Sequence, residues 1–193
     1  MTYLPRAMAA AAMAMMATTA MAEPVKYTLD ASHSQVVFSY DHLGFSTTYN
    51  MFGGFEGEIM FDQDAPEASS VSVEIPVMSM LTGWEKRVAH LMSDDFFGAE
   101  ESDMITFTST GIEVTGENTA NITGDLTIND VTQSVVLDTK LNKAAQHPMA
   151  GKDWVGFDAT TTIKRSDYGL GKFAPNVGDE LNVMISIEAQ KEG

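Results

Sequence analysis

Along most of the chain after residue 30, apolar and polar side chains alternate at every second position. The clearest run covers residues 71–77, with the sequence V-S-V-E-I-P-V, and residues 181–187 repeat the pattern near the C-terminus. Successive side chains of a β-strand point to opposite faces of its sheet. This pattern therefore predicts strands that are buried on one face.

About eight such strands follow one another, separated by turn signals at the spacing of β-sandwiches and β-barrels. Two turns have specific signatures: Gly53-Gly54 predicts a bulge or barrel corner, and Asn129-Asp130 predicts a two-residue hairpin turn. Because the strands alternate with turns and not with helices, we expect one antiparallel, all-β domain. A barrel of about eight strands holds either packed side chains or one small ligand, and periodicity does not distinguish these interiors.

One segment, from Trp84 to Phe97, breaks the alternation. Its apolar residues Trp84, Val88, Leu91 and Met92 are spaced like one face of a short helix. We expect this helix to act as a lid beside the mouth of the barrel.

Residues 1–22 have the pattern of a secretory signal peptide. A basic start up to Arg6 precedes an Ala- and Met-rich run, and Ala20-Met21-Ala22 matches the small-x-small cleavage signal. The apolar run is too short to cross roughly 30 Å of hydrocarbon as a membrane anchor. We therefore expect export, with residues 23–193 forming a single domain.

Composition narrows the possible functions. The net charge of −16 opposes binding to nucleic acid or to anionic lipid surfaces. The chain has no cysteine, which excludes disulfides and thiolate chemistry. A hydrophobic content of 44% argues against disorder for the bulk of the chain.

A set of short motifs runs in a specific order along the chain. Its members are Y-x-L-D-x-S-H-S (27–34), H-L-G (42–44), F-G-G-F-x-G (52–57), R-x-x-H-L (87–91), D-F-F (95–97), I-x-F-x-S-T (105–110), G-D-L-T-I (124–128), R-S-D-Y-G (165–169) and G-D-E (178–180). In this combination the sequence resembles the YceI family of polyisoprenoid-binding proteins. Three positions depart from the usual family pattern: Val88 replaces an Asp, Asp130 replaces a hairpin Gly, and Ser102-Asp103 stands where Pro is common.

The resemblance implies a lipocalin-like, eight-stranded antiparallel barrel over residues 23–193. It also implies a periplasmic protein that binds, carries or sequesters a polyisoprenoid or other long-chain amphiphilic lipid. Isoprenoid, quinone-like and fatty lipids are the expected ligands, without catalysis, cofactor or stable membrane insertion. Many family members are regarded as dimers, so a homodimer is a further expectation.

Candidate ligand residues follow from the apolar faces and from the resemblance. We expect the lipid tail to contact Phe38, Phe45, Phe55, Phe61, Trp84, Leu91, Phe107, Leu126, Phe157 and Ile163. We expect the head group to contact His42, Arg87, His90 and Arg165. Each of these aromatic residues can instead be ordinary core, and Arg165 can instead make a local turn contact with Asp167.

Two other classes of function stay open on the residues alone. One is a stress-related interaction module whose barrel is packed with side chains and holds no ligand. The other is a lipid hydrolase or isomerase, which would need clustered titratable groups in a cavity. The sequence contains no G-x-S-x-G, G-x-G-x-x-G or phosphate-binding Gly-Lys motif, and its four His form no H-x-H or H-E-x-x-H pattern.

Overall fold

The computed structural model describes residues 23–192, so the predicted signal peptide lies outside the described residues. The strands are β1 (Val25–Leu29), β2 (Gln35–His42), β3 (Ser46–Phe52), β4 (Glu56–Phe61), β5 (Ser70–Pro76), β6 (Met104–Gly116), β7 (Thr119–Ile128), β8 (Val131–Gln146), β9 (Asp153–Lys164) and β10 (Glu180–Lys191). The helical elements are α1 (Glu85–Met92) and the 3-10 turns η1 (Pro66–Ala68), η2 (Val77–Ser79) and η3 (Arg165–Tyr168). No helix in this part of the chain has the length and apolar character needed to cross a bilayer.

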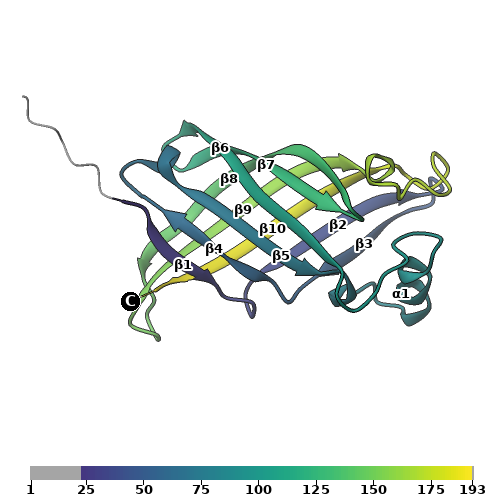
Figure 1. The fold of residues 1–193 in the computed structure, drawn as a ribbon, viewed down its shortest axis with the longest axis horizontal. Helices are drawn as coiled ribbons and strands as arrows, with labels where there is room; N and C mark the ends of the chain where they lie inside the picture. The colour runs from purple at the N-terminus through teal and green to yellow at the C-terminus, as the bar shows by residue number, and fades with distance from the viewer. Residues whose placement is uncertain (1–22, 193) are drawn as a thin grey trace, which may run out of the picture.

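The strands form a closed, eight-stranded antiparallel barrel, as predicted (Figure 1). Its order is β1-β4-β5-β6-β7-β8-β9-β10, and β10 returns to β1 through pairs such as Tyr27 with Lys191. The hairpin of β2 and β3 extends this wall, because β2 pairs with the first half of β10 and β1 with its last residues. Closure leaves no free edge along the barrel strands at the β1–β10 seam.

The predicted turns have the expected backbone conformations. Asn129 and Asp130 link β7 to β8 with φ angles of 52° and 60°, which places both in the left-handed region of a two-residue hairpin. Gly54 separates β3 from β4 with φ of 68°. A residue without Cβ adopts this conformation at no steric cost, which explains the corner at this point in the wall.

The two ends of the barrel differ (Figure 1). The α1 end carries the β5–β6 connection, which includes η2 and α1, together with the β9–β10 loop that contains η3. The opposite end carries the β4–β5 connection with η1 and the β6–β7 hairpin. This assignment follows from the antiparallel order, because β5 leads toward α1 and β6 leads away from it.

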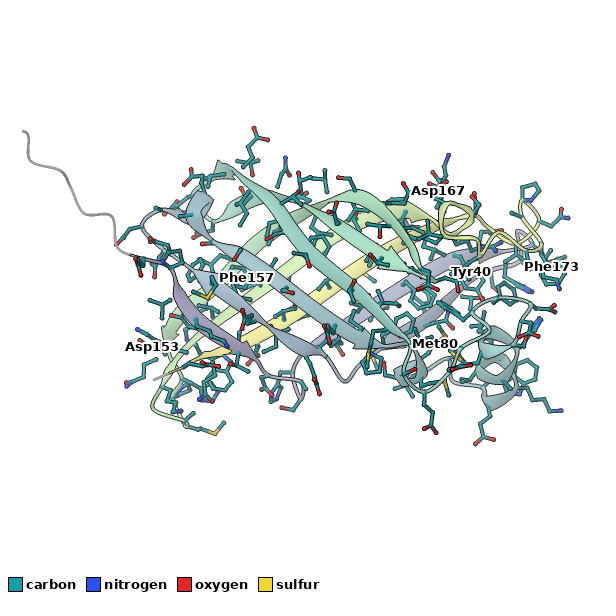
Figure 2. All side chains as sticks on the ribbon, viewed as in Figure 1. Tyr40, Met80, Asp153, Phe157, Asp167 and Phe173 are labelled. Atoms are coloured by element: carbon teal, nitrogen blue, oxygen red, sulfur yellow. The ribbon has the colours of Figure 1, made fainter. Side chains whose placement is uncertain are left out.

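Buried side chains close the α1 end. Val77 and Met80 from the β5–β6 connection are each 3% exposed, and Tyr168 from the β9–β10 loop is 1% exposed. They belong to one cluster with Phe52 and Phe55 at the β3–β4 corner, and Figure 2 labels Met80 at this end. The helix α1 confirms the predicted helical segment, but none of its residues is fully buried.

Candidate functional site

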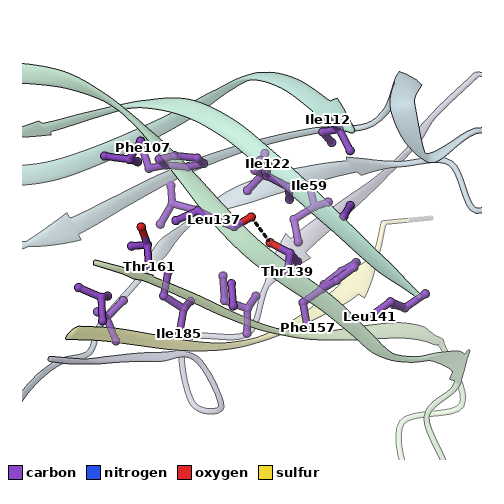
Figure 3. Close-up of a pocket in the computed structure, with 18 of the residues that line it drawn as sticks. Ile59, Phe107, Ile112, Ile122, Leu137, Thr139, Leu141, Phe157, Thr161 and Ile185 are labelled. Atoms are coloured by element: carbon purple, nitrogen blue, oxygen red, sulfur yellow. Dashed lines mark hydrogen bonds between the residues drawn. The ribbon is translucent and has the colours of Figure 1, made fainter. Parts of the chain in front are cut away.

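The barrel encloses a cavity of about 460 Å³. Its walls come from every second residue of the surrounding strands: Phe157, Ala159, Thr161 and Ile163 on β9, and Leu181, Val183, Ile185 and Ile187 on β10. Figure 3 shows Ile59, Phe107 and Leu137 pointing into the same space from other strands. The interior is therefore not filled with side chains from end to end, and the volume lies in the range of small-molecule sites.

The cavity is long and opens away from α1. On β6 its lining runs from Ile105 to Gly116, which is roughly 36 Å along the strand and roughly 28 Å along the barrel axis. At the end opposite α1, Gln63 and Pro66 face the exposed hairpin residues Glu117 and Asn118. We call this opening the end mouth. The expected position of the helical lid beside the mouth is wrong, because α1 lies at the closed end and contributes no residue to the lining.

Polar groups are sparse inside the cavity. Thr139 is 6% exposed, and its hydroxyl donates a hydrogen bond of 3.3 Å to the carbonyl of Leu137. The hydroxyl group of Thr161 comes from the next strand. Among the described residues that line the cavity, only Glu117 at the end mouth has an acidic or basic side chain. The arrangement can therefore hold an apolar chain with few hydrogen-bonding demands.

Seven of the ten residues predicted to contact a lipid tail line this cavity: Phe38, Phe55, Phe61, Phe107, Leu126, Phe157 and Ile163. The other three lie elsewhere. Phe45 is 89% exposed because it lies at the β2–β3 turn, beyond the end of the alternating strand. Trp84 is 58% exposed before α1, and Leu91 packs partly buried against the core cluster.

The aliphatic wall was missed as a site by sequence reasoning. Val71 and Val73 on β5 and the four apolar residues of β10 line the cavity together with the phenylalanines. Their strict alternation predicted an inward face, which was the available signal. Alternation alone does not separate a cavity wall from a packed core.

The four predicted head-group residues do not gather at the cavity. His42 is exposed at the end of β2, and His90 lies 3.4 Å from the carboxylate of Asp95. Arg87 donates a hydrogen bond of 3.1 Å to the carbonyl of Thr82. None of these three residues, nor Arg165, lines the cavity.

Arg165 has a structural arrangement of its own. Arg165 is 6% exposed, and its guanidinium donates hydrogen bonds to four backbone carbonyls of the β9–β10 loop. These acceptors are Leu170, Lys172, Val177 and Gly178. Burial lowers the pKa of Arg165, and the nearby carboxylate of Asp179 opposes this shift. The partners of Arg165 are thus these carbonyls and not the expected Asp167 side chain. Because the carbonyls accept hydrogen bonds from all three guanidinium nitrogens, no free pair of N–H groups is left to bind a head group.

Two buried polar side chains have no hydrogen-bond partner within residues 23–192. They are the side-chain amide of Asn50, which is 3% exposed, and the hydroxyl of Tyr168. Burial raises the pKa of Tyr168 to about 12. Asn50 lies directly opposite Phe38 in the β2–β3 register and so shares its inward face.

In the described part of the chain, one group of three side chains could ligate a metal: Asp30, His33 and Glu188. Each already has a partner within the protein. The imidazole of His33 lies 2.7 Å from the carboxylate of Asp30, which raises the pKa of His33. The indole of Trp154 donates a hydrogen bond of 3.0 Å to Glu188. The first contact holds the β1–β2 corner and the second joins β9 to β10, while the backbone N–H of Asp30 donates to the carbonyl of Glu188 at 2.9 Å. The cluster lies outside the cavity lining.

Comparison with known proteins shows the same architecture in relatives of this chain. The "UPF0312 protein" of Ectopseudomonas mendocina is 38% identical over 168 residues, covering 86% of this chain and 87% of the relative. A crystal structure of the Campylobacter jejuni YCEI protein is 31% identical with a TM-score of 0.71, covering 79% of this chain and 90% of that one. A polyisoprenoid binding domain from Saccharophagus degradans is 15% identical with a TM-score of 0.67, covering 87% and 99%, and shares the fold.

The model of the YceI-like domain matches residues 27–189, which is almost the whole of the described chain. The motifs that carry the resemblance lie within this span. The chain therefore belongs to the YceI family.

Proposed function

We propose that this protein binds a polyisoprenoid or another long-chain amphiphilic lipid inside the barrel and carries or sequesters it in the periplasm. The observation that supports lipid binding is the elongated, apolar cavity of about 460 Å³ that opens at the end mouth. The structural neighbour from Saccharophagus degradans is described as a polyisoprenoid binding domain, which agrees with this ligand class.

The energetics favour a hydrocarbon chain as the occupant. Each CH₂ group that moves from water into the apolar cavity contributes roughly 0.8 kcal/mol of favourable transfer free energy. The few hydroxyl groups in the wall, such as those of Thr139 and Thr161, demand little from a ligand. A quinone-like or fatty chain satisfies the same walls, so the cavity selects for length and apolar character.

The proposed location rests on the N-terminal sequence. Residues 1–22 match a cleavable export signal, and the net charge of −16 for the whole chain opposes binding to anionic membrane surfaces. A binding role without chemistry agrees with the lining, in which Glu117 is the only acidic or basic side chain among the described residues. Fractionation of the native host, with detection of the processed chain in the periplasmic fraction, tests the location.

Ligand binding is tested by filling the cavity. Ala159 is 8% exposed and lines the cavity at the middle of β9, whereas its neighbour Thr160 is exposed on the outer face. We expect protein from its own host to release a lipid on organic extraction and to show the bound mass in native mass spectrometry. Ala159→Phe should reduce the bound fraction at least tenfold, and Thr160→Phe should leave it unchanged.

The proposal fails if the wild-type protein yields no lipid and takes up no added isoprenoid. It also fails if Ala159→Phe, folded by circular dichroism, binds as much lipid as the Thr160→Phe control.

A further inference from the structure

The wall of the barrel is interrupted between β8 and β9. The ladder that joins them ends at the pair Asp138–Thr160, although β8 starts at Val131 and β9 ends at Lys164. On their other sides both strands stay paired: β8 with β7 from Val131 onward, and β9 with β10 up to Lys164. The two strands therefore separate from each other while each remains part of the sheet.

A second cavity of about 470 Å³ lies at this separation. We call it the side slot, lined by Gln133–Val136 of β8, Thr161–Lys164 of β9, and Asp167, Tyr168 and Glu180. Two hydrogen bonds next to the slot reach the β9–β10 loop, one from β8 and one from the β7–β8 turn. Gln133 donates to the carbonyl of Asp167 at 3.3 Å, and Asn129 donates to the carbonyl of Tyr168 at 3.4 Å.

The side slot crosses the barrel wall. Val135, Thr161 and Ile163 line both the slot and the central cavity, so they belong to the inner face. Their neighbours Val136 and Thr162 line the slot from the outer face, because successive strand residues point to opposite sides. In a continuous sheet the hydrogen-bonded backbones separate these two faces, and a single pocket lined by both requires a gap in the ladder.

The chemistry of the side slot differs from that of the central cavity. Its residues are mostly polar, with hydroxyls on Ser134, Thr161 and Thr162. The backbone groups of β8 and β9 that face each other here have no ladder partner across the slot within the described chain. Unpaired peptide N–H and C=O groups are strong donors and acceptors that bind polar partners. The charged residues are Lys164, Asp167 and Glu180, which gives one positive and two negative side chains.

We propose that the side slot holds the polar end of the lipid whose chain occupies the central cavity, and that it selects an uncharged, hydrogen-bonding head group. This inference rests on the proposed lipid binding and adds where the head group lies. The lipid chain then runs from Ile163 toward the end mouth and passes Phe157, which lies roughly 20 Å away along β9. An alcohol or carbonyl head group can form hydrogen bonds with the hydroxyls and with the unpaired backbone groups of the slot. A diphosphate would instead lie near two carboxylates and only one ammonium group, so its negative charge is disfavoured.

The test is to block the slot without touching the cavity. Val136 and Thr162 lie on the outer face and would oppose each other if the register of the β8–β9 ladder continued. The chain has no cysteine, so Val136→Cys with Thr162→Cys reacts with a short bis-maleimide only at this pair. Lys140→Cys with Asp158→Cys is the matched control, because these exposed residues are directly paired in the intact part of the same ladder.

Affinities are measured by displacement of a fluorescent naphthylamine probe that is calibrated for each variant. The ligands are geranylgeraniol, geranylgeranyl diphosphate and phytane, a hydrocarbon of similar chain. We expect the slot crosslink to weaken geranylgeraniol binding about tenfold, which corresponds to about 1.4 kcal/mol, and to leave phytane unchanged. The control crosslink should change neither, and the uncrosslinked protein should bind the diphosphate at least tenfold more weakly than the alcohol.

Equal affinity of the slot-crosslinked and control-crosslinked proteins for geranylgeraniol would overturn the head-group site. Equal affinity of the wild-type protein for the alcohol and the diphosphate would overturn the selection for an uncharged head. If the wild-type protein binds none of the three ligands, lipid binding itself is wrong, and the head-group site falls with it.

Discussion

Arg165 shows how one side chain can organise a loop of the barrel. Its guanidinium donates to carbonyls at Leu170, Lys172, Val177 and Gly178, so a single residue connects both halves of the β9–β10 loop. Tyr168 and Leu170 of this loop are in turn part of the cluster that closes the α1 end. The planar fork of arginine suits several acceptors at fixed angles, which an ammonium group cannot match.

Replacement of Arg165 should therefore destabilise the whole barrel. Arg165→Met leaves buried carbonyls without donors, and we expect a loss of roughly 3 kcal/mol or more in the free energy of unfolding. Arg165→Lys should recover only part of this loss. Urea denaturation measures it, with the exposed neighbour substitution Lys164→Met as control. Equal midpoints for Arg165→Met and the control would show that the carbonyl contacts contribute little.

His33 is a second residue whose role is visible in its contacts. Its imidazole lies 2.7 Å from the carboxylate of Asp30, and this hydrogen bond raises the pKa of His33. The same carboxylate accepts hydrogen bonds from the backbone and hydroxyl of Ser32, which lower the pKa of Asp30. The group thus holds the corner between β1 and β2.

The pH dependence follows from the sign of the His33 shift. Protonated His33 stabilises the folded state fully below its unfolded pKa of about 6.5, and this contribution disappears as the pH rises through the raised folded value. We expect NMR titration of the His33 ring to give a pKa above about 6.5. Asp30→Asn should remove the upward shift, and an unchanged titration in that variant would contradict the assignment.

At the scale of the strand, β7 keeps the cavity open through Gly124. A Cβ atom there would lie 2.4 Å from Cζ of Phe107 and 2.7 Å from the backbone carbonyl oxygen of Thr108. The Phe107 ring therefore lies over the glycine, against the wall of the neighbouring strand. Without this space the ring would project further into the cavity that it lines.

Gly124→Ala tests this packing. We expect a destabilisation of about 1–3 kcal/mol from overpacking, together with weaker lipid binding as the ring moves inward. Thermal unfolding and lipid titration measure the two effects. Gly111→Ala on β6 is the control, because nothing lies within 4 Å of the added Cβ there. If the two variants have the same stability, the close approach to Phe107 does not constrain β7.

The strands also show which parts of the site follow from sequence. Alternation predicted the inward faces of β5, β9 and β10 because each has one apolar and one polar side. It could not predict what α1 packs against. An apolar stripe such as that of Leu91 and Met92 indicates that one helix face is buried but does not identify the surface that buries it. It also missed the side slot, because the apolar positions Val131, Val135 and Leu137 continue through the segment in which β8 separates from β9.

Buried polar groups were the hardest part of the site to predict. The sequence around Arg165 indicates a head-group ligand, but its carbonyl partners come from residues five to thirteen positions later, which the loop folds back onto it. Asn50 lies in a segment that reads as an ordinary strand, and only the pairing with Phe38 places its amide on the inner face. Contacts of this kind depend on tertiary structure, which local patterns do not contain.

For the whole molecule, the cavity sets the length of chain that can be protected from water. We expect the affinity for saturated alcohols to rise by up to roughly 0.8 kcal/mol per CH₂ while the chain lies inside the barrel. The rise should stop once the chain exceeds the roughly 28 Å over which the lining extends. Competition measurements with a series of alcohols test this limit. A constant increment for longer chains, or no increment at all, would mean that the cavity is not the binding site.

The combination of an end mouth and a side slot has a consequence for how the barrel fills. In a barrel with a single opening, water has to leave past the entering hydrocarbon, so binding slows as the lipid chain moves further in. Here the side slot shares Val135, Thr161 and Ile163 with the central cavity, so we expect displaced water to leave through the polar gap between β8 and β9. We therefore expect the barrel to fill while all of its strand pairs stay intact.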